Sequence, residues 1–296
     1  MSEVTLRQLE YFAAVAETQS VTEAARLCHV SQGAVSLALG QLEHALGATL
    51  AVRQRGRGIF LTPEGQAVAT RARLITEQVL GLRTAVSAAH DELAGRLSIG
   101  VFTTVAVHVV PHLAEWFSVR HPAVELNFVE GTGPEIQDAL FSGRTQLSVG
   151  YEAQFDDDCA IDVLHEFHRQ VLLSPDHPLA ACESIGFSQL AEYPAALLNL
   201  EPALQHTLAE FRRYGVTPNV RWLFGNVPSI HSLVGRGLAY SLLMQPTATS
   251  VEGLPLAFRP LSDETPTNSL VAATPVGVDR SAMVREALHS LHSQWT

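Results

Sequence analysis

Polar and basic side chains recur in two adjoining patterns between positions 31 and 57. In the first pattern a Gln and two Ser residues stand at the start of a segment with helical spacing, beside a Gly and a Leu. Gln can bond adenine bidentately, Ser bonds several bases, and an apolar Leu can meet the thymine methyl group. In the second pattern Arg alternates with Gln and Gly, and Arg side chains contact phosphates or enter the minor groove. The DNA contacts predicted from these patterns are Ser31, Gln32, Gly33, Ser36, Leu37, Arg53, Arg55 and Arg57. The alternative is an ordinary three-helix bundle followed by a solvated Arg-rich loop, which has similar spacing.

Hydroxyl and amide side chains follow several strand-like runs further along the chain. Ligands usually bind at the carboxyl ends of parallel strands, and the free N–H groups of a helix start favour an anion or carboxylate. Since most of these side chains are neutral and the surrounding chain is acidic, a weakly charged or uncharged organic ligand is an alternative to an anion, and the residues leave the choice open. Alternatively, Thr104 and Asn226 only cap helices. The candidate ligand-binding residues are Phe102, Thr103, Thr104, Gly131, Thr132, Asn199, Asn226 and Val227, with Phe224 as a further apolar wall.

The thirteen histidines and three cysteines form no metal or disulfide pattern. His165 and His168, near Cys159, lack a third and a fourth ligand. An odd number of cysteines without CxxC spacing argues against a disulfide framework, and the acidic neighbours of Cys159 and Cys182 should raise the thiol pKa values. Cys28 is expected in the core. The sequence contains no GxSxG, P-loop or GxGxxG pattern, so we expect neither an enzyme nor a bound cofactor or metal.

Helix caps and apolar spacing organise the first sixty or so residues. Thr5 and Ser20 each stand three residues before a Gln or Glu, as in the capping box that begins a helix. Ser31 is a suitable N-cap for a third helix that ends at Gly47. The segment 50–62, Gly- and Arg-rich between apolar pairs, favours a two-stranded wing. Val35, Leu39, Leu42 and Leu46 recur at helical spacing in this third helix, and Val35, Leu39 and Leu42 would hold it to its own domain.

A long helix with a heptad-like repeat is expected after Thr62, which can N-cap the helix with Pro63 in its first position. Apolar residues then recur at alternating steps of four and three for about three heptads, as a two-helix coiled coil requires. We expect a dimer helix, and the alternative is a long helix that lies on its own domain. The seam consists of Val68, Ala72, Ile75, Val79, Leu82, Val86 and Ala89.

Strand-like and amphipathic segments alternate after Gly95, which indicates βαβ units and a parallel sheet. A last helix is expected from Arg280 to about Trp295. The length of 296 residues, with 47% hydrophobic and 17% charged, suits two or three domains. Because no apolar run could span a membrane and Met1–Val4 begins no signal segment, we expect a cytoplasmic protein without membrane contact. The strand-like runs are 97–101, 124–128, 147–150, 171–173, 195–198, 220–224, 238–243 and 269–273.

The net charge of −11 is unevenly distributed along the chain. Residues 1–90 hold eight Arg and seven acidic residues, for a net charge of +1, and the remainder carries −12. Between His44 and Pro63 there are three Arg and no acidic residue. The local field at the Arg-rich segment is therefore positive, so the acidic total does not exclude DNA binding.

Residues 6–65 resemble the DNA-binding domain of LysR-type transcriptional regulators. The resemblance is carried by LRQLEYF at 6–12, SVTEAA at 20–25, VSQGAVS at 30–36, LEHALG at 42–47 and LTPEG at 61–65. It implies that Gln32, Ser36 and Arg53 contact DNA, and that the helix from Thr62 to about Ala89 is a dimer linker. Leu37 departs from the family, whose members often have Arg or another polar residue there.

The same resemblance implies an α/β fold for the whole chain. An N-terminal all-α winged helix-turn-helix with a long linker helix would precede two Rossmann-like α/β subdomains, which resemble periplasmic binding proteins and are joined by two crossing strands. The expected divisions are a DNA-binding domain at 1–61, a linker helix at 62–91 and an effector-binding domain at 92–296. Lobe 1 of the latter would take about 92–161 and 270–296, and lobe 2 about 162–269.

By this resemblance the chain is a transcriptional regulator whose sequence-specific DNA binding is controlled by a small-molecule effector held between the lobes. Its implied partners are double-stranded DNA, the effector and further copies of itself in a homodimer or homotetramer, with RNA polymerase as an additional candidate. The residues alone leave two alternatives: a solute-binding sensor that acts through protein contacts, and an enzyme within the α/β part. The sequence leaves open the effector, the operator, and activation versus repression.

Overall fold

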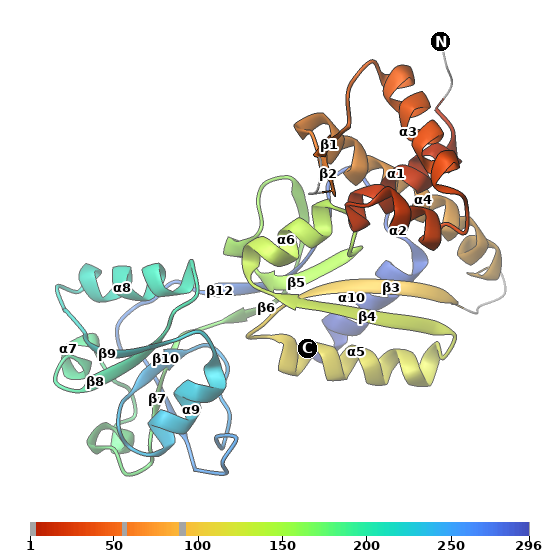
Figure 1. The fold of residues 1–296 in the computed structure, drawn as a ribbon. Helices are drawn as coiled ribbons and strands as arrows, with labels where there is room; N and C mark the ends of the chain where they lie inside the picture. The colour runs from red at the N-terminus through yellow and green to blue at the C-terminus, as the bar shows by residue number, and fades with distance from the viewer. Residues whose placement is uncertain (1–3, 55–57, 89–92, 296) are drawn as a thin grey trace.

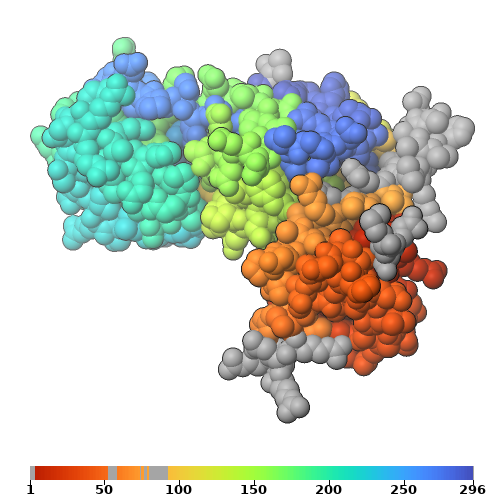
Figure 2. Space-filling view, turned by 90° about the horizontal axis from the view of Figure 1, so that it is seen from above, coloured from red at the N-terminus to blue at the C-terminus, as the bar shows by residue number. Residues whose placement is uncertain are grey.

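The computed structural model describes residues 4–54, 58–88 and 93–295. A helical N-terminal domain is followed by a long helix and two α/β lobes (Figure 1). The N-terminal domain, red and orange in Figure 2, lies next to lobe 1 and away from lobe 2. Among the helices of the described residues, none combines the length and apolar character that a membrane span requires.

The N-terminal domain consists of α1 (Leu6–Thr18), α2 (Val21–Leu27), α3 (Gln32–Leu46) and a wing formed by β1 (Ala51–Gln54) and β2 (Gly58–Leu61). The predicted N-caps are confirmed, because the hydroxyls of Thr5, Ser20 and Ser31 each accept a hydrogen bond from a backbone N–H in the first turn. α3 ends at Gly47, whose φ of 66° lies in the left-handed region that glycine adopts without a steric penalty.

Helix α4 (Pro63–Ala88) begins by packing on the N-terminal domain. The Thr62 hydroxyl accepts from Gly65 N–H at 2.9 Å and donates to Thr49 O at 2.7 Å, so it joins the helix start to the loop before the wing. Gly65 is required for this approach, since a Cβ there would lie 1.9 Å from Leu50 O. Further along α4, the Arg73 guanidinium donates to Ser142 O of lobe 1 at 2.9 Å.

Lobe 1 is built on a five-stranded sheet with the order β4-β3-β5-β12-β6. β3, β4 and β5 are parallel, and β12 runs antiparallel to both β5 and β6. α5 and α6 lie on opposite faces of the sheet (Figure 1), and α10 packs with α5 in the core. The elements are β3 (Gly95–Phe102), α5 (Ala106–Arg120), β4 (Val124–Gly131), α6 (Gly133–Phe141), β5 (Leu147–Tyr151), η1 (Glu152–Gln154), β6 (Cys159–Phe167), β12 (Asn268–Pro275) and α10 (Ala282–Gln294).

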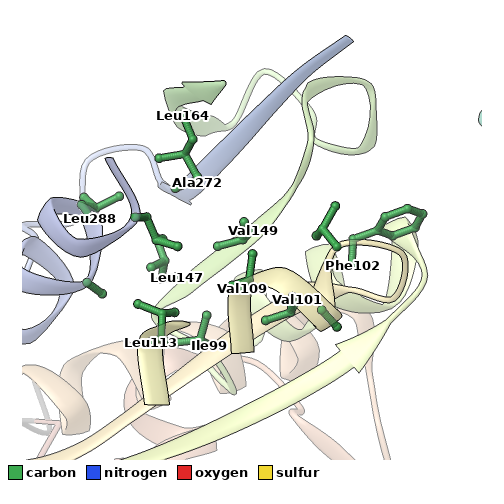
Figure 3. Packing of buried hydrophobic residues seen from close by; sticks show 14 of the residues in the cluster. Ile99, Val101, Phe102, Val109, Leu113, Leu147, Val149, Leu164, Ala272 and Leu288 are labelled. Carbon is green, nitrogen blue, oxygen red and sulfur yellow. The ribbon is translucent and has the colours of Figure 1, made fainter. Parts of the chain in front are cut away.

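Alternating residues of β3 serve the two faces of the sheet. Ile99 and Val101 are fully buried and belong to the cluster that includes Leu113 of α5 (Figure 3). Gly100 faces the other way, where an added Cβ would lie 2.4 Å from the Ser148 hydroxyl and 3.4 Å from a carbon of Ile136 in α6. The small residue at this point lets α6 pack close to the sheet.

Lobe 2 contains two small sheets, a three-stranded antiparallel one with the order β10-β7-β11 and a parallel pair β8-β9. A bridge between Ala195 and Tyr240 connects the two. Tyr240 and Phe211 are fully buried in the core of the lobe. The elements are β7 (Gln170–Leu173), η2 (Pro178–Ala181), α7 (Phe187–Leu190), β8 (Pro194–Leu198), α8 (Ala203–Arg213), β9 (Asn219–Phe224), α9 (Val227–Gly235), β10 (Ser241–Leu243) and β11 (Ala257–Pro260).

The chain passes twice between the lobes, once from β6 to β7 and once from β11 to β12 (Figure 1). β6 and β11 had no counterpart among the strands expected from the sequence, and the run 238–243 forms a strand only over its last three residues. The sheet of lobe 1 is mixed and not purely parallel as expected, because the two crossings bring β12 back antiparallel between β5 and β6.

Candidate functional site

The N-terminal end of α3 presents the predicted base-reading residues at the surface of the protein. Leu37 is 65% exposed, so its apolar side chain is free to meet a thymine methyl group. Val35 and Leu39 lie buried on the other side of the same helix, so the domain core holds the helix from behind. The predicted residues that reach the surface here are Ser31, Gln32, Gly33, Ser36 and Leu37.

The wing carries the predicted Arg contacts. β1 and β2 pair antiparallel, and the backbone of Arg53 lies opposite Ile59. Ile59 is buried in the domain core and so anchors the wing. Arg55 and Arg57 lie outside the described residues. The contacts of these three Arg side chains with DNA stay predictions.

The carboxyl ends of β3, β4 and β5 form the second candidate site. We call this edge, with Phe102–Thr104, Gly131–Thr132 and Tyr151, the interlobe edge, because the crossing strands β6 and β12 meet beside Tyr151 there. The register aligns Phe102 with Gly131, and Thr103 N–H donates to Gly131 O at 3.0 Å. The five residues predicted in lobe 1 are therefore neighbours: Phe102, Thr103, Thr104, Gly131 and Thr132.

Two of these hydroxyls differ in how they are used. The Thr132 hydroxyl and N–H both donate to Glu135 Oε2 at 2.8 Å, and these bonds hold the pKa of Glu135 below its usual value. Thr132 therefore acts as a cap of α6. The Thr104 hydroxyl is buried and makes no hydrogen bond of ordinary distance and angle among the described residues, although it lies close enough to the Tyr151 hydroxyl to lower the pKa of Tyr151. An unpaired buried hydroxyl costs about 1–3 kcal/mol, so Thr104 is better suited to bind something that is not protein.

In lobe 2 the predicted residues lie at the ends of β8 and β9. Asn199 N–H donates to Phe224 O at 2.8 Å, and the Asn199 side chain is exposed. Asn226 Oδ1 accepts from Ser229 N–H at 2.9 Å and caps α9, which leaves its NH₂ group for other partners. Val227 packs beside Phe224 in an apolar cluster. Within the described chain, no hydrogen bond joins this set to the interlobe edge.

A buried charged group that the sequence did not reveal lies in the first crossing between the lobes. Arg169, in the crossing from β6 to β7, is 7% exposed. Its Nη1 donates to Thr207 Oγ1 at 2.5 Å and lies 3.5 Å from Glu210 Oε2, both on α8. Its charge also acts on Tyr151 at the interlobe edge. The available signal was a single Arg two residues before the apolar run 171–173, near the expected lobe boundary.

Burial dominates the titration of these groups. Burial raises the pKa of Tyr151, against smaller lowering effects of the Thr104 hydroxyl and the Arg169 charge. Burial likewise raises the pKa of Glu210 more than Arg169 and Arg213 lower it. The same loss of water lowers the pKa of Arg169. The ion pair is therefore held where both charges are costly.

The cysteines and histidines are consistent with structural roles. All three cysteines are unpaired, and Cys28 is half-buried, not in the core as expected. The pKa of Cys159 is raised to about 11, by burial first and then by Asp156 and Asp158, so its thiol is protonated near neutral pH. The described residues contain no group of three metal-ligating side chains.

A surface depression of about 490 Å³ lies between β4 and α6. It contains none of the predicted effector residues, although it lies next to Gly131 and Thr132 in sequence. Acidic side chains dominate it, and its Arg144 pairs with Asp138 at 2.6 Å. The depression adjoins the interlobe edge through Glu135, which accepts both hydrogen bonds from Thr132. Its lining residues are Val129, Glu130, Pro134, Glu135, Asp138 and Arg144.

Comparison with known proteins covers nearly the whole chain. Residues 6–66 match the bacterial regulatory helix-turn-helix proteins of the lysR family, and residues 90–296 match the LysR substrate binding domain. The chain is 26% identical over 250 residues to the transcriptional regulator CysB of Haemophilus influenzae, which covers 83% of this chain and 77% of CysB. It is 35% identical over 177 residues to a probable hydrogen peroxide-inducible genes activator of Mycobacterium xenopi, covering 60% of this chain and 93% of the relative.

The same fold is seen in a full-length OxyR variant from Pseudomonas aeruginosa. The TM-score is 0.79 with 24% sequence identity, and the match covers 98% of this chain and 95% of OxyR. The expected α/β fold with an N-terminal helix-turn-helix is thereby confirmed. The family matches also decide against the protein-contact sensor and the enzyme. The chain belongs to the LysR family: it is a DNA-binding transcriptional regulator with an effector-binding domain.

Proposed function

We propose that the chain reads its operator with the N-terminal end of α3 in the major groove, where Gln32 and Ser36 contact base edges and Ser31, Gly33 and Leu37 line the surface. The observation that carries this proposal is the exposure of this end of α3 while Val35 and Leu39 anchor its other side in the core. Arg53, Arg55 and Arg57 of the wing contact phosphates or the minor groove.

A salt-titrated binding assay on the DNA upstream of the gene tests this assignment. Affinity should fall steeply with salt, and a random duplex should bind more weakly. Gln32→Ala should lose about 1–3 kcal/mol of discrimination at one operator position, because a bidentate adenine contact is removed. Gln66→Ala, an exposed residue of α4, is the matched control. The assignment would be refuted if the wild type and Gln32→Ala each bound the operator and the random duplex with equal affinity.

The effector binds between the lobes in this proposal. Thr103 and Thr104 at the interlobe edge bind it from lobe 1, and the side chains of Asn199 and Asn226 bind it from lobe 2. Phe102, Gly131, Thr132 and Val227 shape the walls. The unpaired buried hydroxyl of Thr104 supports this assignment. Thr104→Phe should abolish effector-dependent changes in DNA binding without changing basal DNA affinity.

A second copy of the chain covers the seam of α4. Ala72 is buried against its own domain, whereas Ile75 and Val79 are 42% and 38% exposed. A helix that presents apolar residues to water at heptad spacing gains stability when the same helix of another copy covers them. Measurement of the molecular mass in solution for the wild type and Val79→Glu tests the dimer. Pairing of dimers into tetramers is a further step of the same proposal.

The domain limits proposed are 1–61, 62–91 and 92–296, with lobe 1 at about 92–161 and 270–296 and lobe 2 at about 162–269. The proposed location is the cytoplasm, where a regulator meets DNA and RNA polymerase.

A further inference from the structure

Arg169 is a buried cation in the segment between β6 and β7. Removing a charged group from water costs several kcal/mol unless partners with good geometry replace the solvent. A guanidinium has five N–H donors in a rigid fork, and it is most stable when a carboxylate accepts two of them at once. The partners of Arg169 therefore show how completely the protein itself satisfies this group.

The partners of Arg169 within the described chain use only one of its three nitrogens. Nη1 donates to Thr207 Oγ1 and lies 3.5 Å from Glu210 Oε2. That distance is longer than a charge-assisted hydrogen bond, and Glu210 Oε2 accepts no hydrogen bond from the described residues. Nε and Nη2 have no hydrogen-bond acceptor in the described part of the chain. The N–H groups on the Nε and Nη2 side of the guanidinium are thus available to a further acceptor.

Residues of the interlobe edge lie close to this group. Tyr151 is near enough for its pKa to respond to the Arg169 charge and to the Thr104 hydroxyl. The Tyr151 ring also packs against Phe102 and Phe167, with ring centroids 6.1 Å and 6.5 Å apart. Phe167 lies two residues before Arg169 in the same crossing, so its contact with Tyr151 brings this crossing to the interlobe edge that holds Thr104.

We infer that the effector of this regulator carries an anionic group, and that this group binds the free edge of the Arg169 guanidinium with the Thr104 hydroxyl as a second donor. A carboxylate matches this arrangement because its two oxygens accept from the fork and from a hydroxyl together. This inference rests on the proposed effector site between the lobes. It chooses between the anion and the neutral ligand, which the sequence residues without Arg169 left open.

Pairs of small probes that differ only in charge test the inference on the full-length protein. Benzoate with benzamide, and acetate with acetamide, are titrated at constant ionic strength while the thermal unfolding midpoint is recorded. We expect the carboxylates to raise the midpoint and the amides to leave it unchanged. Arg169→Gln should weaken carboxylate binding by about 10- to 100-fold, the loss expected for one hydrogen bond to a charged group.

The matched control is Arg259→Gln, a half-buried residue of β11 whose Nε donates to Ala180 O at 2.9 Å. This variant should keep the preference for the carboxylates. The inference is overturned if amides and carboxylates raise the midpoint equally, if the preference survives Arg169→Gln, or if no carboxylate raises the wild-type midpoint.

Thr104→Val keeps the test decisive if Arg169→Gln does not fold. Since it removes a buried hydroxyl that has no partner, it should leave the unliganded midpoint unchanged or higher while weakening carboxylate binding. If an amide binds, and its binding requires the side chains of Thr103 and Asn199 but not that of Arg169, then the effector site between the lobes is supported and the assignment of an anionic effector is wrong. If carboxylate binding depends on none of these side chains, both fall.

Discussion

Replacement of Leu37 by Arg should strengthen DNA binding and make it more sensitive to salt. Leu37 is 65% exposed on the surface of α3 that carries the predicted base contacts, so the substitution leaves the domain core unchanged. The stability should therefore change by less than about 0.5 kcal/mol. An Arg at this place reaches a phosphate and releases one more condensed counterion from the DNA.

The size of the effect follows from counterion release. Each additional phosphate contact steepens the slope of log K against log salt by about 0.9, so a dimer with two copies of α3 gains about 1.8. Between 50 and 200 mM salt, the variant should lose about twelvefold more affinity than the wild type. Fluorescence anisotropy of a labelled operator duplex, titrated at several salt concentrations, measures both slopes.

Two controls separate a local contact from a general gain of charge. Leu37→Gln changes the polarity at the same position without adding charge, and should keep the wild-type slope. Val119→Arg adds the same charge to α5, where Val119 is 74% exposed in the effector domain. If Leu37→Arg has the same slope as Val119→Arg, then this surface of α3 does not meet DNA and the interface is placed wrongly.

Three further predictions concern stability. Gly65→Ala should unfold the N-terminal domain and abolish DNA binding, since its Cβ would lie 1.9 Å from a backbone oxygen. Gly40→Ala, whose new Cβ has no atom within 4 Å, should instead raise the free energy of unfolding by about 0.5–1 kcal/mol. Circular dichroism during denaturation distinguishes the two variants. Leu113→Ala should cost lobe 1 about 2–5 kcal/mol, measured by urea denaturation, and a smaller loss would show that the core collapses around the cavity. The pKa of the Cys159 thiol is raised from 9.0 to about 11 in the folded protein, so the protonated thiol stabilises the fold fully below pH 9 and this stabilisation is lost as the pH rises towards 11. The free energy of unfolding should therefore fall less over this pH range in Cys159→Ala than in the wild type. Equal pH profiles for the two proteins would contradict this.

The local elements of the N-terminal domain were predictable because their signals are local. Thr5, Ser20 and Ser31 cap the helices that they were expected to cap, and Gly47 ends α3. The inward stripe of α3 follows the spacing of a helix that has one buried side. Such features depend on residues three or four positions apart, which a single sequence contains.

The second candidate site was predictable only in part, because tertiary contacts decide it. The strand ends at Phe102 and Gly131 were identified, and the structure places them side by side. Arg169 was missed since its burial depends on α8, which lies about 40 residues further along the chain. No local pattern distinguishes a buried Arg from a solvated one. β6 was missed for the same reason, as it is a strand only because β12 returns to pair with it.

The position of β12 has a consequence for how the protein is made. β12 forms hydrogen-bonded ladders with both β5 and β6, although it begins at Asn268 and they end at Tyr151 and Phe167. While the chain is still being synthesised, the first lobe has a gap within its sheet until all of lobe 2 has left the ribosome. The N-terminal domain carries no such dependence and can fold while still attached. A nascent regulator can thus hold a formed DNA-reading domain before its sensor is complete, and a chain truncated before Asn268 would keep lobe 1 open.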